Sequence, residues 1–224
     1  MRSAGPTEPL TGSAWRSLLP DVHPLPITSI GGSAEAVAPR LLGCHLLSLV
    51  DGVVVAGRIV EVEAYLGPDD PASHAATRAG RTRRNAPMYG APGTAYVYFI
   101  YGMHWCFNVV TGAPGDPQAV LIRALEPVIG TEAMARRRDR TSELANGPAR
   151  LSEALGINGS LNEHLLSDPP LLLLDGELRE GEAVAVSGRI GVREAADWPL
   201  RYFIEGNPAL SRRGPVPSLQ GAVS

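Results

Sequence analysis

Aromatic side chains are concentrated in one segment of this 224-residue chain. Seven of its twelve Trp, Tyr and Phe residues lie between positions 89 and 107: Tyr89, Tyr96, Tyr98, Phe99, Tyr101, Trp105 and Phe107. Arginines flank this segment, as a run before it and singly after it: Arg78, Arg81, Arg83, Arg84 and Arg123. A strand-like sequence with two carboxylates, 61–65, comes before both. Stacking rings, guanidinium groups and carboxylates together indicate an enzyme that stacks a base and cleaves a bond beside it.

The two carboxylates, Glu61 and Glu63, could activate a water molecule. If 60–65 is a strand, Glu61, Glu63 and Tyr65 share one face, and the residues between them face the other way. One interpretation is a catalytic base on that face. The alternative is a solvent-exposed polar face over buried valines, which is common in amphipathic strands. The spacing leaves both interpretations open.

The rings also allow two interpretations. Tyr96 and Tyr98 share one face of a predicted strand, whereas Tyr101 has the opposite parity and precedes Gly102 at a turn. Two rings could line a pocket while the third projects from a hairpin tip, or all could be core packing. Gly102 favours an exposed tip. His74, in the preceding loop, is by itself typical of a surface histidine.

Two polar residues interrupt otherwise apolar strands. Asn108 lies within the sequence CFNVV and Arg123 within VLIRA. Polar groups in such places need hydrogen-bond partners or a wet cavity. Asn108 and Arg123 are therefore better site candidates than any surface charge.

The cysteine and lysine contents restrict the chemistry. Cys44 and Cys106 are too few for a disulfide framework, which predicts a reducing compartment. His45 and His104 lie near them, but the spacings are not those of zinc modules, so we expect no metal and no other cofactor. All 20 basic residues are Arg, which excludes a lysine Schiff base.

The charge and hydropathy of the chain limit which binding partners and cellular locations we expect. The formal net charge of −3 argues against a uniformly basic surface, although nucleic-acid binding needs only a local basic patch. The second arginine run, 136–140, could be such a patch or a solvated helix end. Residues 1–10 lack the apolar segment of a signal peptide, and no apolar run is long enough to span a membrane. We expect a cytoplasmic protein that is not secreted.

The predicted architecture is α+β, a single domain with a mainly antiparallel β-sheet core, flanking helices and a protruding β-hairpin. We expect a flexible leader over 1–27, with one short helix near 15–19, then the domain over 28–211 and a flexible tail over 212–224. Helices are predicted over 34–43, 131–138 and 148–155. Strands are predicted over 44–50, 53–65, 94–100, 104–110, 119–125, 184–186, 190–192 and 200–204. The long irregular segment 66–93 is expected to be functional.

Several motifs resemble the alkyladenine (3-methyladenine) DNA glycosylase family, of the monofunctional kind. They are GRIVEVEAYLGP at 57–68, PGTAYVYFIYGM at 92–103 and LIRALEP at 121–127, with weaker matches at 147–148 and 200–203. The similarity runs from Ala38 to Pro208, roughly. Because the motifs occur in the right order and spacing, the resemblance is specific.

The resemblance implies a role for each matching residue. Glu63 would be the base that activates the attacking water, and Arg123 would hold that water and the carboxylate. Tyr65 and His74 would stack on one face of a flipped base and Tyr98 on the other. The backbone N–H of His74 would also bind the base.

Five further residues would act in or around this pocket, and one of them, Asn108, would set its specificity. Asn108 would crowd the 2-amino group of guanine and so disfavour normal purines. Tyr101 would wedge into the minor groove and fill the gap left by the flipped nucleotide. Met88, Thr82 and Arg84 would lie near the DNA backbone.

The implied activity is DNA repair. Alkylated or deaminated purines in double-stranded DNA would be flipped out, and hydrolysis of the N-glycosidic bond by a cofactor-free monomer would leave an abasic site. One alternative is a non-catalytic damaged-DNA-binding module, which would not need Glu63 paired with Arg123. The zinc pattern of base deaminases is absent. A nucleoside hydrolase would not need Tyr101.

Overall fold

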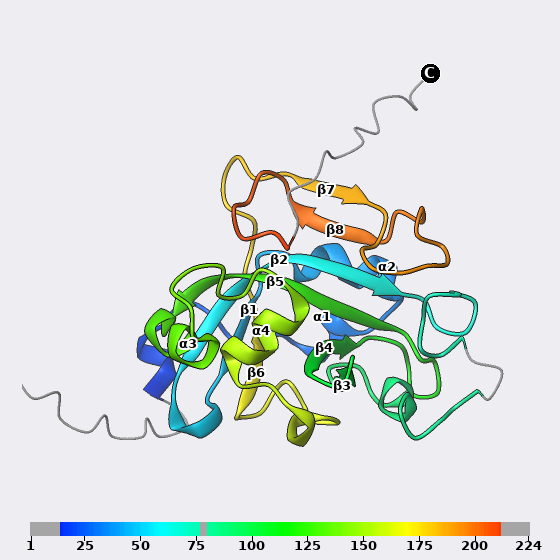
Figure 1. Cartoon of the computed structure of the whole chain (residues 1–224), viewed down its shortest axis with the longest axis horizontal. Helices are drawn as coiled ribbons and strands as arrows, with labels where there is room; N and C mark the ends of the chain where they lie inside the picture. Colours follow the sequence, from blue (N-terminus) through cyan, green and yellow to red (C-terminus); the bar gives the residue numbers. More distant parts are fainter. Residues whose placement is uncertain (1–13, 77–79, 212–224) are drawn as a thin grey trace, which may run out of the picture.

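The computed structural model describes residues 14–76 and 80–211, with an eight-stranded sheet at its centre (Figure 1). The main strand order is β3-β4-β5-β2-β1-β6, and β8 pairs with both β2 and β7. All strand pairs within the described residues are antiparallel. The predicted α+β fold with a mainly antiparallel sheet is confirmed.

The elements have the following bounds. The strands are β1 (His45–Ser48), β2 (Val55–Tyr65), β3 (Ala95–Ile100), β4 (His104–Val110), β5 (Ala119–Ile129), β6 (Leu171–Leu174), β7 (Val184–Ser187) and β8 (Arg201–Ile204). The α-helices are α1 (Ile27–Ile30), α2 (Ala34–Val37), α3 (Thr131–Arg138) and α4 (Pro148–Leu155). Short 3₁₀ helices are η1 (Ala14–Ser17), η2 (Ala38–Leu41), η3 (Val50–Gly52), η4 (Ala86–Tyr89) and η5 (Gly159–Leu161).

Strand β2 is the central element. Every residue from Val55 to Ala64 is buried, on both faces of the strand. On one side β2 pairs with β5, with register shifts around Glu61, and on the other it pairs with β1 and then with β8. Glu61 and Glu63 are both 0 % exposed, so the alternative of a solvated polar face is wrong. Two carboxylates inside the fold must have polar partners.

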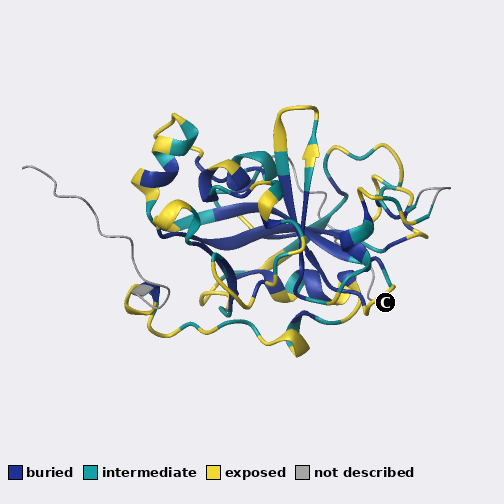
Figure 2. Cartoon of the chain, turned by 90° about the horizontal axis from the view of Figure 1, so that it is seen from below, coloured by how far each residue is buried: buried dark blue, intermediate teal, exposed yellow. Residues whose placement is uncertain are grey.

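Strands β3 and β4 form the protruding hairpin that the sequence predicts. Their register places Phe99 opposite Trp105 and Tyr96 opposite Asn108. Figure 2 shows the hairpin projecting from the fold, with its exposed tip in yellow. Tyr101 lies at that tip with φ of 55°, followed by Gly102 with φ of 67°.

Other predicted elements divide into confirmed and corrected ones. Helices over 131–138 and 148–155 are confirmed as α3 and α4. The helix over 34–43 is divided into α2 and η2, because Pro39 has no N–H to continue an α-helix. The strand over 190–192 is wrong: the N–H of Ile190 bonds the side chain of Glu63, and Gly191 has φ of 79°. Strand β6, a buried run of four leucines, was not predicted.

The second arginine run mainly joins helices. Arg137 donates hydrogen bonds to the carbonyl oxygens of Ala154 (3.1 Å) and Val50 (2.9 Å), and Arg138 pairs with Glu153. These contacts tie α3 to α4 and to η3, the 3₁₀ helix that follows β1. Structural bonding therefore accounts for two of the arginines in the run.

The described part of the expected leader contacts the sheet. Trp15 is buried in an apolar cluster that includes Leu47, Val54 and Leu172. Residues 1–13 and 212–224 lie outside the described residues, so the division into leader, domain and tail stays a prediction. Within the described ranges, no helix has the length and apolar character needed to cross a membrane.

Candidate active site

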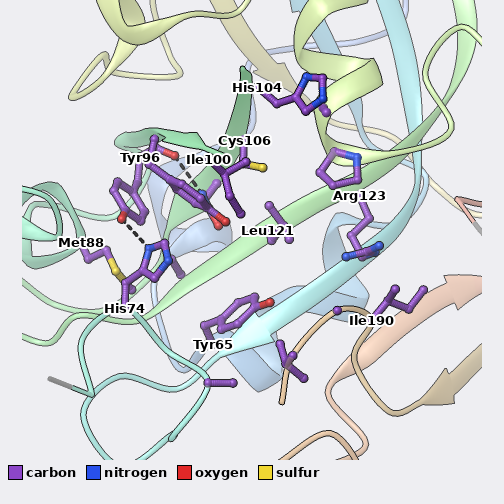
Figure 3. A pocket seen from close by; sticks show the side chains of 18 of the residues that line it. Tyr65, His74, Met88, Tyr96, Ile100, His104, Cys106, Leu121, Arg123 and Ile190 are labelled. Carbon is purple, nitrogen blue, oxygen red and sulfur yellow. Dashed lines mark hydrogen bonds between the residues drawn. The ribbon is translucent and has the colours of Figure 1, made fainter. Parts of the chain in front are cut away.

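A pocket of about 420 Å³ opens beside the β3–β4 hairpin (Figure 3). Its walls come from β2, β3, β4, β5, the start of α4 and two loops, 71–74 and 190–194. The side chains or backbones that line it include Tyr65, His74, Met88, Tyr96, Tyr98, Tyr101, Cys106, Asn108, Leu121, Arg123 and Ile190. The size lies within the range of small-molecule sites, roughly 300–1,000 Å³.

Glu63 lies one contact behind the pocket wall. Its Oε2 accepts hydrogen bonds from the Tyr65 hydroxyl (3.0 Å) and from Nη1 of Arg123 (3.2 Å). Its Oε1 accepts one from the backbone N–H of Ile190 (2.7 Å). All three donors belong to residues that line the pocket. A carboxylate has about four acceptor positions, so this geometry leaves capacity for one more donor, such as a water.

Arg123 joins Glu63 to a second carboxylate. Its Nε lies 3.1 Å from Oε1 of Glu61, which also accepts from Nε of Arg201 at 2.7 Å. The N–H of Ser211 donates to Oε2 of Glu61 at 2.6 Å. Burial alone would raise the pKa of Glu61, but Arg123, Arg201 and Ser211 together lower it. Burial likewise opposes the charge of Arg123, but Glu63 and Glu61 outweigh it and raise its pKa.

A second buried ion pair fixes the loops beside Tyr65. Arg189 contacts Asp70 through two hydrogen bonds, of 2.5 and 2.7 Å, and both side chains are fully buried. The Arg189 guanidinium also lies over the Tyr65 ring, 4.8 Å from its centroid. Burial, followed by the charge of Glu63, raises the pKa of Tyr65, so its hydroxyl keeps the proton that it donates.

Three rings form the wall opposite. His74 contacts Tyr98 edge-on with ring centroids 4.5 Å apart, and Tyr96 lies 5.3 Å from Tyr98. Nδ1 of His74 and the hydroxyl of Tyr96 are hydrogen-bonded at 2.8 Å (Figure 3). Burial, with a smaller contribution from Arg84, lowers the pKa of His74 to about 4. His74 is therefore neutral at physiological pH and adds no positive charge to the pocket.

Asn85 holds the loop that carries His74. Its amide donates to the carbonyl oxygens of His74 (2.9 Å) and Gly80 (3.1 Å), and it accepts from the N–H of Thr82 (2.6 Å). The N–H of His74 has no acceptor among the described residues. This is compatible with the predicted role of that N–H in binding a base.

The hairpin supplies one polar group to the pocket wall. Asn108 is buried and donates through Nδ2 to the carbonyl oxygen of Tyr96 (3.0 Å). Cys106 lines the same wall, and burial raises the pKa of its thiol, which stays protonated. Asn108 thus has a fixed orientation beside the pocket.

The predicted DNA-facing residues differ in exposure. Tyr101 is 80 % exposed at the hairpin tip, and Arg84 is exposed with its guanidinium 5.4 Å from the Tyr98 ring centroid. Thr82 is half-buried. Met88 is buried and lines the pocket, so its position favours a part in the wall. Arg78 lies outside the described residues.

Four residues around the site were not predicted: Asp70, Arg189, Arg201 and Ser211. Glu61 was predicted to share a strand face with Glu63, but its contacts with Arg123 and Arg201 were not predicted. Arg201 had a usable signal because, like Arg123, it interrupts an apolar strand. Asp70 and Arg189 meet across 119 residues, and no local pattern connects them.

Comparisons with known proteins show which sequences this chain resembles. Residues 29–208 match the family described as "Methylpurine-DNA glycosylase (MPG)". A protein of Carboxydothermus hydrogenoformans named "Putative 3-methyladenine DNA glycosylase" is 46% identical over 180 residues, covering 79% of this chain and 93% of the relative. A protein of the same name from Methanoculleus marisnigri is 47% identical over 195 residues, covering 84% and 99% of the two chains.

Proposed function

Because the chain belongs to the methylpurine-DNA glycosylase family and is a monofunctional DNA repair glycosylase, we propose that it flips a damaged purine into the pocket beside Glu63. A base stacked inside a duplex cannot reach a buried carboxylate, so it must leave the helix, at a cost of a few kcal/mol. The observation that carries this proposal is the position of Glu63, whose three donors all line one aromatic pocket.

The pocket suits an alkylated purine. Methylation at N3 or N7 makes the ring cationic, and a tyrosine face attracts a cation by about 0.5–2 kcal/mol. Tyr65 and Tyr98 supply such faces, and neutral His74 does not repel the charge. Asn108, fixed by its bond to Tyr96, would crowd the 2-amino group of guanine.

Glu63 supplies the chemistry. A cationic purine is already a good leaving group, so the protein mainly needs to direct a water and stabilise an oxocarbenium-like sugar. Glu63 would accept a proton from the water as the oxygen attacks the sugar carbon and the bond to the base breaks. Arg123, which contacts Glu63, keeps that carboxylate in place and would help to hold the water.

The hairpin would open the duplex. Tyr101 projects from the tip, where its ring can fill the gap that a flipped nucleotide leaves. Thr82 and Arg84 come from the segment before the hairpin and would contact the DNA backbone as the base enters, whereas the buried Met88 would form part of the pocket wall. We also propose that the protein acts as a monomer in the cytoplasm, where it has access to the cell's DNA.

Base release from methylated duplex DNA tests this function. The purified protein is incubated with that DNA in EDTA, free bases are separated by chromatography, and strand integrity is measured on a denaturing gel. Because the chain has no Lys for a Schiff base, we expect free methylpurines and strands that break only after alkali or heat. Tight binding to the DNA without released base would favour a damaged-DNA-binding module.

A further inference from the structure

The buried ion pair between Asp70 and Arg189 joins the two loops that border the pocket. Asp70 belongs to the loop that continues to His74, and Arg189 begins the loop 189–194. The carboxylate of Asp70 also accepts the N–H groups of Leu66 (3.1 Å) and Ala72 (3.1 Å). Asp70 therefore has donors on both oxygens and holds the Arg189 guanidinium in one orientation.

That guanidinium covers one face of Tyr65. Its Cζ lies 4.8 Å from the ring centroid, and its Nη1 donates to the carbonyl oxygen of Ala64 at 3.0 Å. Tyr65 lines the pocket, whereas Arg189 is fully buried and does not line it. Arg189 thus packs against the ring of Tyr65 from outside the pocket.

The residue after Arg189, Ile190, contacts the carboxylate of Glu63. The N–H of Ile190 donates to Oε1 of Glu63 at 2.7 Å. Because only one peptide bond separates the two residues, the anchored side chain of Arg189 restricts where that N–H can lie. The buried guanidinium of Arg189 therefore restricts the positions of both the Tyr65 ring and the Ile190 N–H that contacts Glu63.

We propose that Arg189, held by Asp70, is a positioning residue that fixes the Tyr65 ring for stacking and the Ile190 N–H against Glu63. This inference rests on the proposed function, because it assigns Tyr65 and Glu63 their roles in base binding and hydrolysis. Displacements of about 1 Å in such groups slow catalysis by on the order of 100-fold. Loss of Arg189 should therefore affect lesion binding and chemistry together.

The chain offers a matched control in Arg58. Its guanidinium is also buried, pairs with Glu126 at 2.9 Å and with Glu182, and lines no part of the pocket. Within the described residues, Nε of Arg58 and Nε of Arg189 both lack a hydrogen-bond partner. Replacing either with Met removes one buried cation of a similar kind, but only Arg189 touches Tyr65.

The test compares Arg189→Met with Arg58→Met at a temperature at which both are folded by circular dichroism. Single-turnover base release is measured with enzyme in saturating excess over methylated duplex. Binding to lesion and undamaged duplexes is measured separately in a Glu63→Gln background, where no base is released. Arg189→Lys keeps the charge without the two-pronged contact and serves if Arg189→Met does not fold.

We expect Arg189→Met to slow base release at least about tenfold relative to Arg58→Met, and Arg189→Lys to slow it at least about threefold. Preference for lesion over undamaged duplex should fall by a similar factor in the Glu63→Gln background. Release rates and lesion preference equal to those of Arg58→Met would overturn the inference. Failure of the unaltered protein to release any base would instead overturn the proposed function.

Discussion

Nη1 of Arg123 lies 3.2 Å from Oε2 of Glu63. Both side chains are buried, and they come from the neighbouring antiparallel strands β5 and β2. The same guanidinium contacts Glu61 through Nε. Arg123 thereby orients two buried carboxylates. A carboxylate that is to act as a base must be held in place beside its water, so this contact is a precondition of the proposed chemistry.

Replacing Arg123 with Met should strongly destabilise the protein. Removing one partner of a buried ion pair leaves an uncompensated charge, which costs about 3–5 kcal/mol. We expect a corresponding fall in the free energy of unfolding, measured by urea denaturation. Base release should also fall in the folded protein.

The matched control for that experiment is Arg150→Met. Arg150 pairs with Glu143 at 3.1 Å on the surface, where such pairs contribute about 0–1 kcal/mol. If Arg123→Met were no less stable than Arg150→Met, the buried contacts of Arg123 with Glu61 and Glu63 would not stabilise the fold as we infer.

Tyr101→Ala should weaken binding to damaged duplex DNA. The side chain is 80 % exposed, so its loss leaves the folded protein intact. Stacking of an aromatic side chain on bases contributes about 1–3 kcal/mol, which corresponds to about 5- to 150-fold in affinity. We expect that loss in a binding titration and a smaller change in single-turnover base release from bound substrate.

A control for the wedge is Val184→Ala, which removes an exposed apolar side chain from β7. Its affinity for damaged duplex should match that of the unaltered protein. Equal affinities for Tyr101→Ala and Val184→Ala would argue against insertion of the tip.

Stability should decrease as the pH falls through the titration range of His74. Burial lowers its pKa from 6.5 to about 4, so between these values the unfolded chain binds a proton that the folded protein does not. Stability is therefore retained above pH 6.5 and lost towards pH 4, by on the order of 3 kcal/mol at most. Because the pKa of Glu61 is lowered below 4.5, its own effect begins at lower pH.

The measurement is urea unfolding between about pH 5 and 6.5, where His74 acts and Glu61 does not. We expect His74→Gln to reduce the slope of stability against pH. His104→Gln, which changes an exposed histidine, should leave the slope unchanged. Identical slopes for His74→Gln and the unaltered protein would contradict the lowered pKa.

Sequence patterns predicted the site to the extent that it is built from local strands. Alternation along 60–65 placed Glu61, Glu63 and Tyr65 on one face, and polar residues within apolar strands identified Asn108 and Arg123. Periodicity could not show that β2 is buried on both faces, because that depends on the distant segments that pack against each face of the sheet.

Contacts between distant loops were beyond prediction. The apolar residues at 190–192 suggested a strand, yet Ile190 donates its N–H to Glu63 and the preceding Arg189 pairs with Asp70. Likewise, the sequence alone indicated an ordinary surface histidine at His74, because its contacts with Tyr96 and Tyr98 form only in the folded protein. Tertiary contacts of this kind leave no period in the sequence.

The most direct test of Glu63 as the catalytic base is the Glu63→Gln variant, assayed for base release and for DNA binding with the same methylated duplex. Gln keeps the shape of the side chain and can still contact Arg123 and Tyr65, but it cannot accept a proton from water. General-base catalysis contributes typically about 10²–10⁴-fold. We predict a loss of base release of at least that size with affinity for damaged duplex within about threefold of the unaltered protein; retained base release, or an equal loss of release and binding, would contradict the assignment.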